Sequence, residues 1–135
     1  MAKENGLGAS LTVDDSGGTP RVVSNDIQSC TFDTPRGELP VPGIDVSSQE
    51  RLLGLGDFTA SCVGAFNDAA STGWFTVVRD SVSTDVVRTW AYALSGQTLS
   101  LEANITTNSY ARGADGSMAI TTGFALQDGT DPTWS

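Results

Sequence analysis

The chain has 135 residues, which is enough for one domain with a buried core and too few for two. Its 16 acidic and 7 basic side chains give a formal charge of -9, and the scattered arginines exclude an ordinary nucleic-acid-binding protein. Mean hydropathy is -0.09 without a long apolar run, so we expect a soluble protein with no membrane span and no secretory signal.

Strand patterns dominate the start of the chain, where we expect residues 1–8 to form an N-terminal arm and residues 9–135 a single domain. The acidic, glycine-rich segment 14–20 ends in a proline, which indicates a loop. Ile27 and Phe32 are the expected core residues of this part. Three β-prone segments are expected as strands: 8–13, 21–24 and 26–32.

Residues 33–48 break the strand pattern, because they contain three prolines and two glycines that disfavour a continuous ladder. We expect a long inter-strand loop or arm. Unstructured loops of this length are uncommon in small domains and are usually functional or disordered, and the apolar residues here favour docking over disorder. The candidate self-assembly residues of this loop are Arg36, Glu38, Leu39, Val41 and Ile44.

The middle of the chain combines strand and helix signals. We expect a tight bend at residues 54–56 and a strand within 56–67, whose alternate residues form one buried face. Trp74, Phe75, Val78 and Val82 then follow at spacings of three and four, which predicts a short helix between residues 72 and 82.

The last third predicts antiparallel hairpins. Segments 86–94 and 97–110 flank the dipeptide 95–96 (Ser-Gly), and apolar residues alternate with polar ones from Leu99 to Ile105. A further turn precedes an alternating strand that ends at Leu126. The predicted fold is therefore all-β: a β-sandwich or partial barrel of antiparallel strands with one short flanking α-helix.

Residues that usually carry catalysis are scarce. The chain has no histidine, which removes Ser-His-Asp and Cys-His machinery and imidazole ligands. Cys30 and Cys62 are far apart in sequence and are expected to be small buried thiols rather than a disulfide. We predict no enzyme activity, no cofactor and no metal. The nearest carboxylate pairs lie in turn-like segments, where aspartate bonds its own backbone: 14 with 15, 80 with 85, and 128 with 131.

Aromatic residues leave two interpretations open. Trp74, Trp90 and Trp134, with Tyr92 and Tyr110, could form a platform on which sugars stack, as in carbohydrate-binding modules. Packing is the favoured interpretation, because Trp90 and Tyr92 share one face of a predicted strand and could meet the core or a neighbouring subunit.

Several segments resemble the tail tube proteins of long-tailed bacteriophages, especially phages with actinobacterial hosts. These segments follow the family's order along most of the chain, although no single motif is diagnostic. They are residues 50–58 (ERLLGLGDF), 64–67 (GAFN), 110–112 (YAR), 115–117 (DGS) and 127–134 (QDGTDPTW).

The resemblance implies a structural subunit that assembles into stacked hexameric rings, with a central sheet that closes into a barrel around a hollow conduit for DNA ejection. It implies that the loop at 33–48 reaches a neighbouring subunit, and that the partners are the tape measure, tail tip and tail terminator proteins. Such a subunit is assembled in the host cytoplasm and resides in the virion tail. An acidic lumen would let DNA pass without specific binding, and Glu102 is our candidate for a lumen-facing acid.

Two other classes remain as alternatives. A capsid-decorating or head-to-tail joining protein would form trimers or closed rings without tubes. A carbohydrate-binding module would stay monomeric and bind glycans through its tryptophans.

Overall fold

The computed structural model describes residues 7–45, 47–81, 83 and 87–135. Three predicted features include residues outside these ranges: the N-terminal arm at residues 1–6, the helix at Val82, and the start of a strand at residue 86. Within them the chain forms β1 (Ser10–Asp14), β2 (Pro20–Val22), β3 (Ile27–Asp33), β4 (Arg36–Pro40), β5 (Arg51–Gly56), β6 (Thr59–Ala65), α1 (Trp74–Val78), β7 (Arg88–Leu94), β8 (Gln97–Arg112), β9 (Met118–Leu126) and β10 (Thr133–Trp134).

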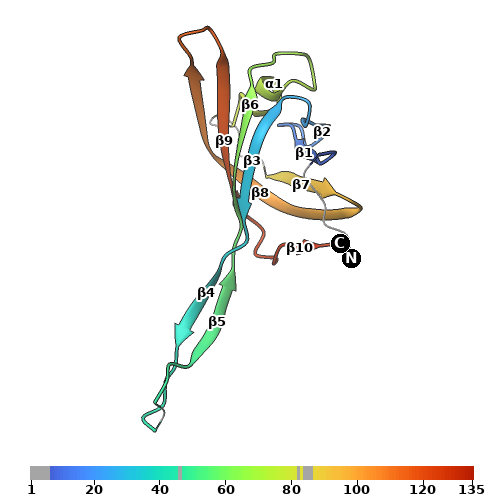
Figure 1. The fold of residues 1–135 in the computed structure, drawn as a ribbon. Helices are drawn as coiled ribbons and strands as arrows, with labels where there is room; N and C mark the ends of the chain where they lie inside the picture. The colour runs from blue at the N-terminus through green and yellow to red at the C-terminus, as the bar shows by residue number, and fades with distance from the viewer. Residues whose placement is uncertain (1–6, 46, 82, 84–86) are drawn as a thin grey trace.

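The strands form an antiparallel sheet in the order β2-β1-β7-β8-β9-β6-β3, with β10 added to β8 (Figure 1). The long strand β8 belongs to both halves of this sheet: its first half pairs with β7 and its second half with β9. The partner changes at Ala103, and a register shift of the kind made by a β-bulge follows within the β8–β9 pairing, between Ile105 and Thr107. The predicted all-β sandwich with one short helix is confirmed, and its sheet is not a closed barrel.

Aromatic side chains join the two halves of the sheet across the core. Trp90 of β7 lies 5.3 Å from Phe32 of β3 and 4.9 Å from Phe58, measured between ring centroids. Trp74 of α1 enters the same core, and its indole N–H donates to the carbonyl of Ile120. Because β7 and β3 lie on opposite sides of the long strand β8 in the strand order, the contact between Trp90 and Phe32 holds the sheet folded over. The apolar core consists of Leu11, Val13, Val23, Phe58, Ala60, Cys62, Trp74, Val77, Val78, Trp90, Leu99, Leu101, Ala103, Ile120 and Phe124.

The helix is confirmed but shorter than predicted. A distant carboxylate satisfies its first turn: Asp26 accepts hydrogen bonds from the backbone N–H of Trp74 at 3.0 Å and from the side-chain amide of Asn67 at 3.0 and 3.1 Å. This contact replaces a local N-cap side chain, which Gly73 cannot provide. Three of its five residues are buried, so packing rather than helix propensity stabilises it.

A buried arginine ties β1, β7 and the helix together. Arg88 is 1% exposed, and its guanidinium donates to the backbone carbonyls of Asp14 and Val77 and to the carboxylate of Asp80. Burial alone would raise the pKa of Asp80, but hydrogen bonds from Ser16, from the backbone and from Arg88 bring that pKa below its ordinary value.

The hairpin predicted around residues 95–96 is confirmed. Ser95 and Gly96 have φ angles of 54° and 80°, the pair of positive values that a type I′ turn requires. In the strand that follows, Leu99, Leu101 and Ala103 are buried as the alternation predicts. The short strand β10 was not predicted, because Thr133 and Trp134 offer too short a pattern, and its pairing with β8 fixes the end of the chain.

The expectation of an unpaired loop over 33–48 is wrong for residues 36–40, which form β4. The expectation of a tight bend at residues 54–56 is also wrong, because these residues end β5. β4 and β5 pair as a two-stranded antiparallel ribbon, here called the arm, which extends away from the folded-over sheet (Figure 1). The prolines do not prevent this, because both strands of an isolated ribbon are edges and Pro40 lies at the end of β4. A register shift between Arg36 and Glu38 absorbs the irregularity at Gly37.

Candidate assembly surfaces

The arm carries apolar side chains on both of its faces. Leu39 lies opposite Leu52 on one face, whereas Leu53 lies opposite Glu38 on the other, with Leu55 two residues further on. These leucines are exposed, up to 92% for Leu55, because no strand or helix in the described part of the chain covers either face of the ribbon. Contiguous exposed apolar surface of this kind marks an interaction site.

The predicted assembly residues take different roles in the arm. Leu39, Val41 and Ile44 are exposed, with Ile44 in the turn at the tip. Arg36 donates to the carbonyl of Gly54 across the ribbon at 2.9 Å. Glu38 forms a salt bridge with Arg51 of the opposite strand, with 3.3 Å between the charged nitrogen and oxygen. The polar members therefore bridge the two strands of the ribbon, and the apolar members remain exposed.

Leu52, Leu53 and Leu55 are likewise exposed but were not among the predicted assembly residues. Their segment was interpreted as a bend because two glycines flank Leu55, and a strand was not expected there. A signal was nevertheless present, since three leucines in four positions beside a second apolar segment predict a pair of strands.

The sheet leaves main-chain hydrogen-bonding groups available at its margins. β3 is the last strand of the sheet and pairs on one side only, with β6, in the described part of the chain. The second half of β8 pairs with β9, while its opposite edge has no partner strand among the described residues. Exposed strand edges of this kind are templates for pairing with another chain.

The face of the sheet that points away from the core is lined by small side chains. In β9 these are Thr121, Gly123 and Ala125, which alternate with buried residues. Across β3, β6, β7, β8 and β9 the positions that alternate with the core hold no Lys or Arg, and their acidic members are Asp33 and Glu102. This face therefore carries mostly short side chains and a weak negative charge.

Glu102 lies on this outward face where β8 pairs with β7. Its carboxylate accepts a hydrogen bond from the hydroxyl of Thr89, 2.7 Å away on the neighbouring strand, and the residue is half-buried. Asp33 lies on the outward face of β3 and is exposed. The two acids therefore belong to different halves of the folded-over sheet.

The tryptophans do not form the sugar-stacking platform of the alternative interpretation. Trp74 and Trp90 are fully buried and cannot present a ring face to a ligand. Tyr92 packs against Phe32 with their ring centroids 5.0 Å apart. Trp134 is 49% exposed, and its ring centroid lies 6.3 Å from that of Phe32. The packing interpretation is confirmed for Trp74 and Trp90.

The prediction that the aspartates of turn-like segments bond neighbouring backbone is confirmed for Asp15 and Asp128. It is wrong for Asp14, which lies in β1 and accepts from the distant N–H of Thr89 at 3.2 Å. Asp15 accepts from the N–H of Thr19, which is the main reason why the pKa of Asp15 lies below its ordinary value. Asp128 accepts from the N–H of Thr130 at 3.1 Å. Asp85 lies outside the described residues. Among the residues that are described, no three His, Cys, Asp or Glu side chains gather into a potential metal site.

No helix in the described ranges has the length and apolar character needed to cross a membrane.

Solved structures share the fold of this chain, although no protein-family model and no curated protein matches its sequence. A chain from the C6-symmetric tail of an empty GTA particle aligns with a TM-score of 0.75 and 17% identity, over 98% of each chain. A chain from the virion of a native gene transfer agent gives 0.77 and 15%, over 97% of this chain and 99% of that one. A chain from the six-fold symmetrised baseplate of the anti-feeding prophage gives 0.66 and 8%, over 100% and 97%. These full-length matches confirm the fold that the resemblance to tail tube proteins implies.

Proposed function

We propose that the protein is a structural subunit of a phage tail tube, which assembles with copies of itself into stacked hexameric rings around a hollow conduit for DNA. The observation that carries the proposal is the full-length similarity in fold to chains from tail and baseplate assemblies with six-fold symmetry. A subunit of this kind works without catalysis, as a passive scaffold of the virion tail that is built in the host cytoplasm.

The arm is the proposed contact between subunits. No described residue covers its two apolar faces, and a neighbouring copy would bury them. Burying Leu39 on one face and Leu53 with Leu55 on the other would contribute several kcal/mol in total, at about 25 cal/mol per Å² of apolar surface. The free edges of β3 and β8 supply the main-chain groups with which adjacent subunits would continue the sheet around the lumen.

The acidity of the subunit suits a channel through which DNA moves without binding. The formal charge is -9, and the outward face of the sheet, which is lined by small side chains, carries acids without Lys or Arg. A wall of this character repels the phosphate backbone instead of holding it. We take Glu102 as the lumen candidate and Asp33 as its counterpart on the other half of the sheet. The tape measure, tail tip and tail terminator proteins would be the remaining partners of the assembled tube.

Electron microscopy of the purified protein over a concentration series, with light scattering, tests assembly. Hollow tubes of stacked rings are expected for the wild type. Leu53→Ser combined with Leu55→Ser should abolish tubes and leave the melting temperature unchanged, because both side chains are exposed in the free subunit. Val22→Ser is the matched control, since Val22 is 63% exposed on β2, away from the arm. Closed rings without tubes would indicate a head-to-tail joining protein, and tubes from the double variant would refute the role of the arm.

Ejection kinetics of phage that carry charge-reversal variants test the lumen. Glu102→Lys should slow DNA ejection and leave the tail length unchanged, if the β7–β8 half of the sheet lines the channel. Slower ejection with Asp33→Lys instead would assign the channel to the β3–β6 half. Normal kinetics with both variants would contradict an electrostatic role of these acids.

A further inference from the structure

The two cysteines lie directly opposite each other in the middle of the paired strands β3 and β6. Cys30 of β3 and Cys62 of β6 are partners in the antiparallel register, and their Sγ atoms are 2.8 Å apart. Both are free thiols; Cys62 is buried as expected, and Cys30 is only half-buried. Opposed residues of antiparallel strands have Cα atoms about 4.5–5.5 Å apart, inside the range of about 4.4–6.8 Å that a disulfide requires. No large backbone movement is therefore needed to join them.

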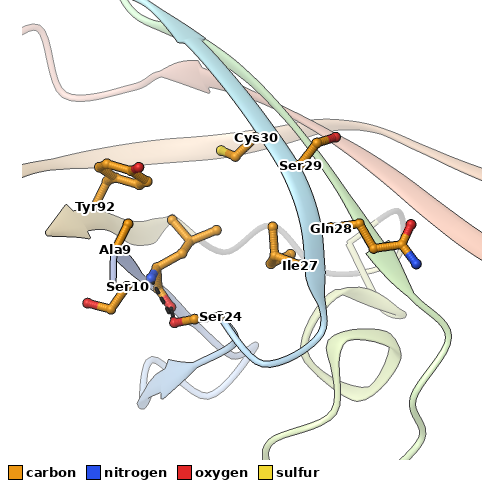
Figure 2. Close-up of a pocket in the computed structure, with 9 residues that line it drawn as sticks. Ala9, Ser10, Ser24, Ile27, Gln28, Ser29, Cys30 and Tyr92 are labelled. Atoms are coloured by element: carbon orange, nitrogen blue, oxygen red, sulfur yellow. Dashed lines mark hydrogen bonds between the residues drawn. The ribbon is translucent and has the colours of Figure 1, made fainter. Parts of the chain in front are cut away.

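Cys30 is accessible to a small reagent. It lines a cavity of about 200 Å³ between β3 and the β1–β7 pair, together with Tyr92, Ile27 and Ser29. Figure 2 shows the Cys30 side chain projecting from β3 on the side of Tyr92. Cys62, in contrast, has no exposed surface. An oxidant would therefore meet Cys30 first.

The pair divides into an attacking and a resolving thiol. A hydrogen bond from Cys62 lowers the pKa of Cys30 against the opposing effect of burial. The pKa of Cys62 is raised, first by its hydrogen bond with Cys30 and then by burial. Thiolates are the nucleophiles of disulfide exchange, so Cys30 is the group that reacts with an external disulfide.

We propose that Cys30 and Cys62 are a redox modification site, at which a small disulfide such as oxidised glutathione converts the two thiols into a β3–β6 disulfide. The Cys30 thiolate attacks one sulfur of the oxidant, forms a mixed disulfide and releases one glutathione thiolate. The Cys62 sulfur then gives up its proton, attacks the Cys30 sulfur and releases the second glutathione thiolate. The two electrons and two protons lost by the cysteines are thus gained by the oxidant, which ends as two thiols.

The position of the bond gives it a consequence. β3 is held to the rest of the sheet only through β6 in the described part of the chain, and both strands of the arm lie between Cys30 and Cys62 in sequence. The disulfide would close a covalent ring that contains the whole arm, and it would fix the edge strand β3 to β6. A reducing cytosol keeps such a pair as thiols, whereas an oxidising exterior favours the bond.

Incubation of the folded protein with oxidised glutathione, beside a sample kept in dithiothreitol, tests the proposal. The expected product has no titratable thiol, the mass of the chain less two hydrogens, and a peptide map that joins the Cys30 and Cys62 peptides. Closing a loop of this size should raise the melting temperature by about 10 °C. Cys62→Ser should stop at a stable glutathione adduct on Cys30, and Cys30→Ser should react slowly because Cys62 is buried.

Three results would overturn the proposal. These are two titratable thiols after prolonged oxidation, a wild-type adduct that never resolves, and disulfide-linked dimers in place of the internal bond. All these readouts use the wild-type chain in its free form, so they are independent of whether the protein assembles into tubes.

Discussion

Replacing Arg88 by methionine removes one side chain that joins three elements. Its guanidinium is buried and donates to the carbonyls of Asp14 and Val77 and to the Asp80 carboxylate. Methionine fills a similar volume but has no N–H. Because the two carbonyls belong to the main chain, they stay in place and lose their side-chain donor.

The cost follows from the groups that are left behind. A buried acceptor without a partner costs about 1–3 kcal/mol, and breaking a buried charge pair from one side typically costs about 3–5 kcal/mol. We therefore expect Arg88→Met to lower the free energy of unfolding by about 3–5 kcal/mol. A domain of this length has a total of about 7–20 kcal/mol, so the variant should fold but melt about 10–20 °C lower.

Urea unfolding and thermal melts followed by circular dichroism measure this loss. Arg112→Met is the matched control, because Arg112 is exposed at the end of β8 and its replacement should change stability by less than about 0.5 kcal/mol. The loss of stability for Arg88→Lys should lie between those of Arg112→Met and Arg88→Met, since one ammonium keeps the charge but cannot reproduce the guanidinium fork. A loss below about 1 kcal/mol for Arg88→Met would refute the reasoning, because it would mean that the carbonyls find other donors at no cost.

Three further outcomes are expected. Gly64→Ala should destabilise the free subunit by about 1–3 kcal/mol, because its Cβ would lie 2.7 Å from the Trp74 ring, while Gly37→Ala in the open arm should be nearly neutral in a urea titration; equal effects would contradict this. Asp26→Ala should cost about 1–3 kcal/mol and reduce the helical signal, because the first helical N–H loses its acceptor, and an unchanged melt would count against that role. The pKa of Asp80 is depressed in the folded state, so the stabilisation by its carboxylate is complete above the ordinary pKa of 3.8 and is lost as pH falls below that value. The stability difference between wild type and Asp80→Asn should therefore shrink below pH 3.8. A constant difference from about pH 7 to about pH 2 would rule out this contribution of the carboxylate.

Local patterns were enough to predict the parts of the fold whose partners are close in sequence. The β7–β8 hairpin follows from its Ser-Gly turn and from the alternation that begins at Leu99, and both are fixed within a few residues of the turn. The short helix likewise follows from the spacing of Trp74, Phe75 and Val78. These features depend on local conformation and on one buried face, which a single sequence records directly.

Features that depend on distant pairing could not be predicted from the sequence. The contact between Cys30 and Cys62 requires the register between β3 and β6. These two strands are separated in sequence by the whole arm. The burial of Arg88 depends on carbonyls from β1 and the helix. The arm was mistaken for a loop because proline disfavours strands within a sheet, whereas an isolated ribbon tolerates it at strand ends. The leucines of β5 were therefore missed with it.

Strand β8 is one unbroken strand that serves both halves of the folded-over sheet. The two halves consequently cannot slide past each other as independent plates: a shear between them would have to stretch or bend a covalent main chain that is hydrogen-bonded on either side of Ile105. A pull on the β9 half therefore reaches β7 along peptide bonds, in addition to any displacement of packed side chains. The sheet should therefore resist shear between its two halves, with bending concentrated at the β-bulge after Ile105.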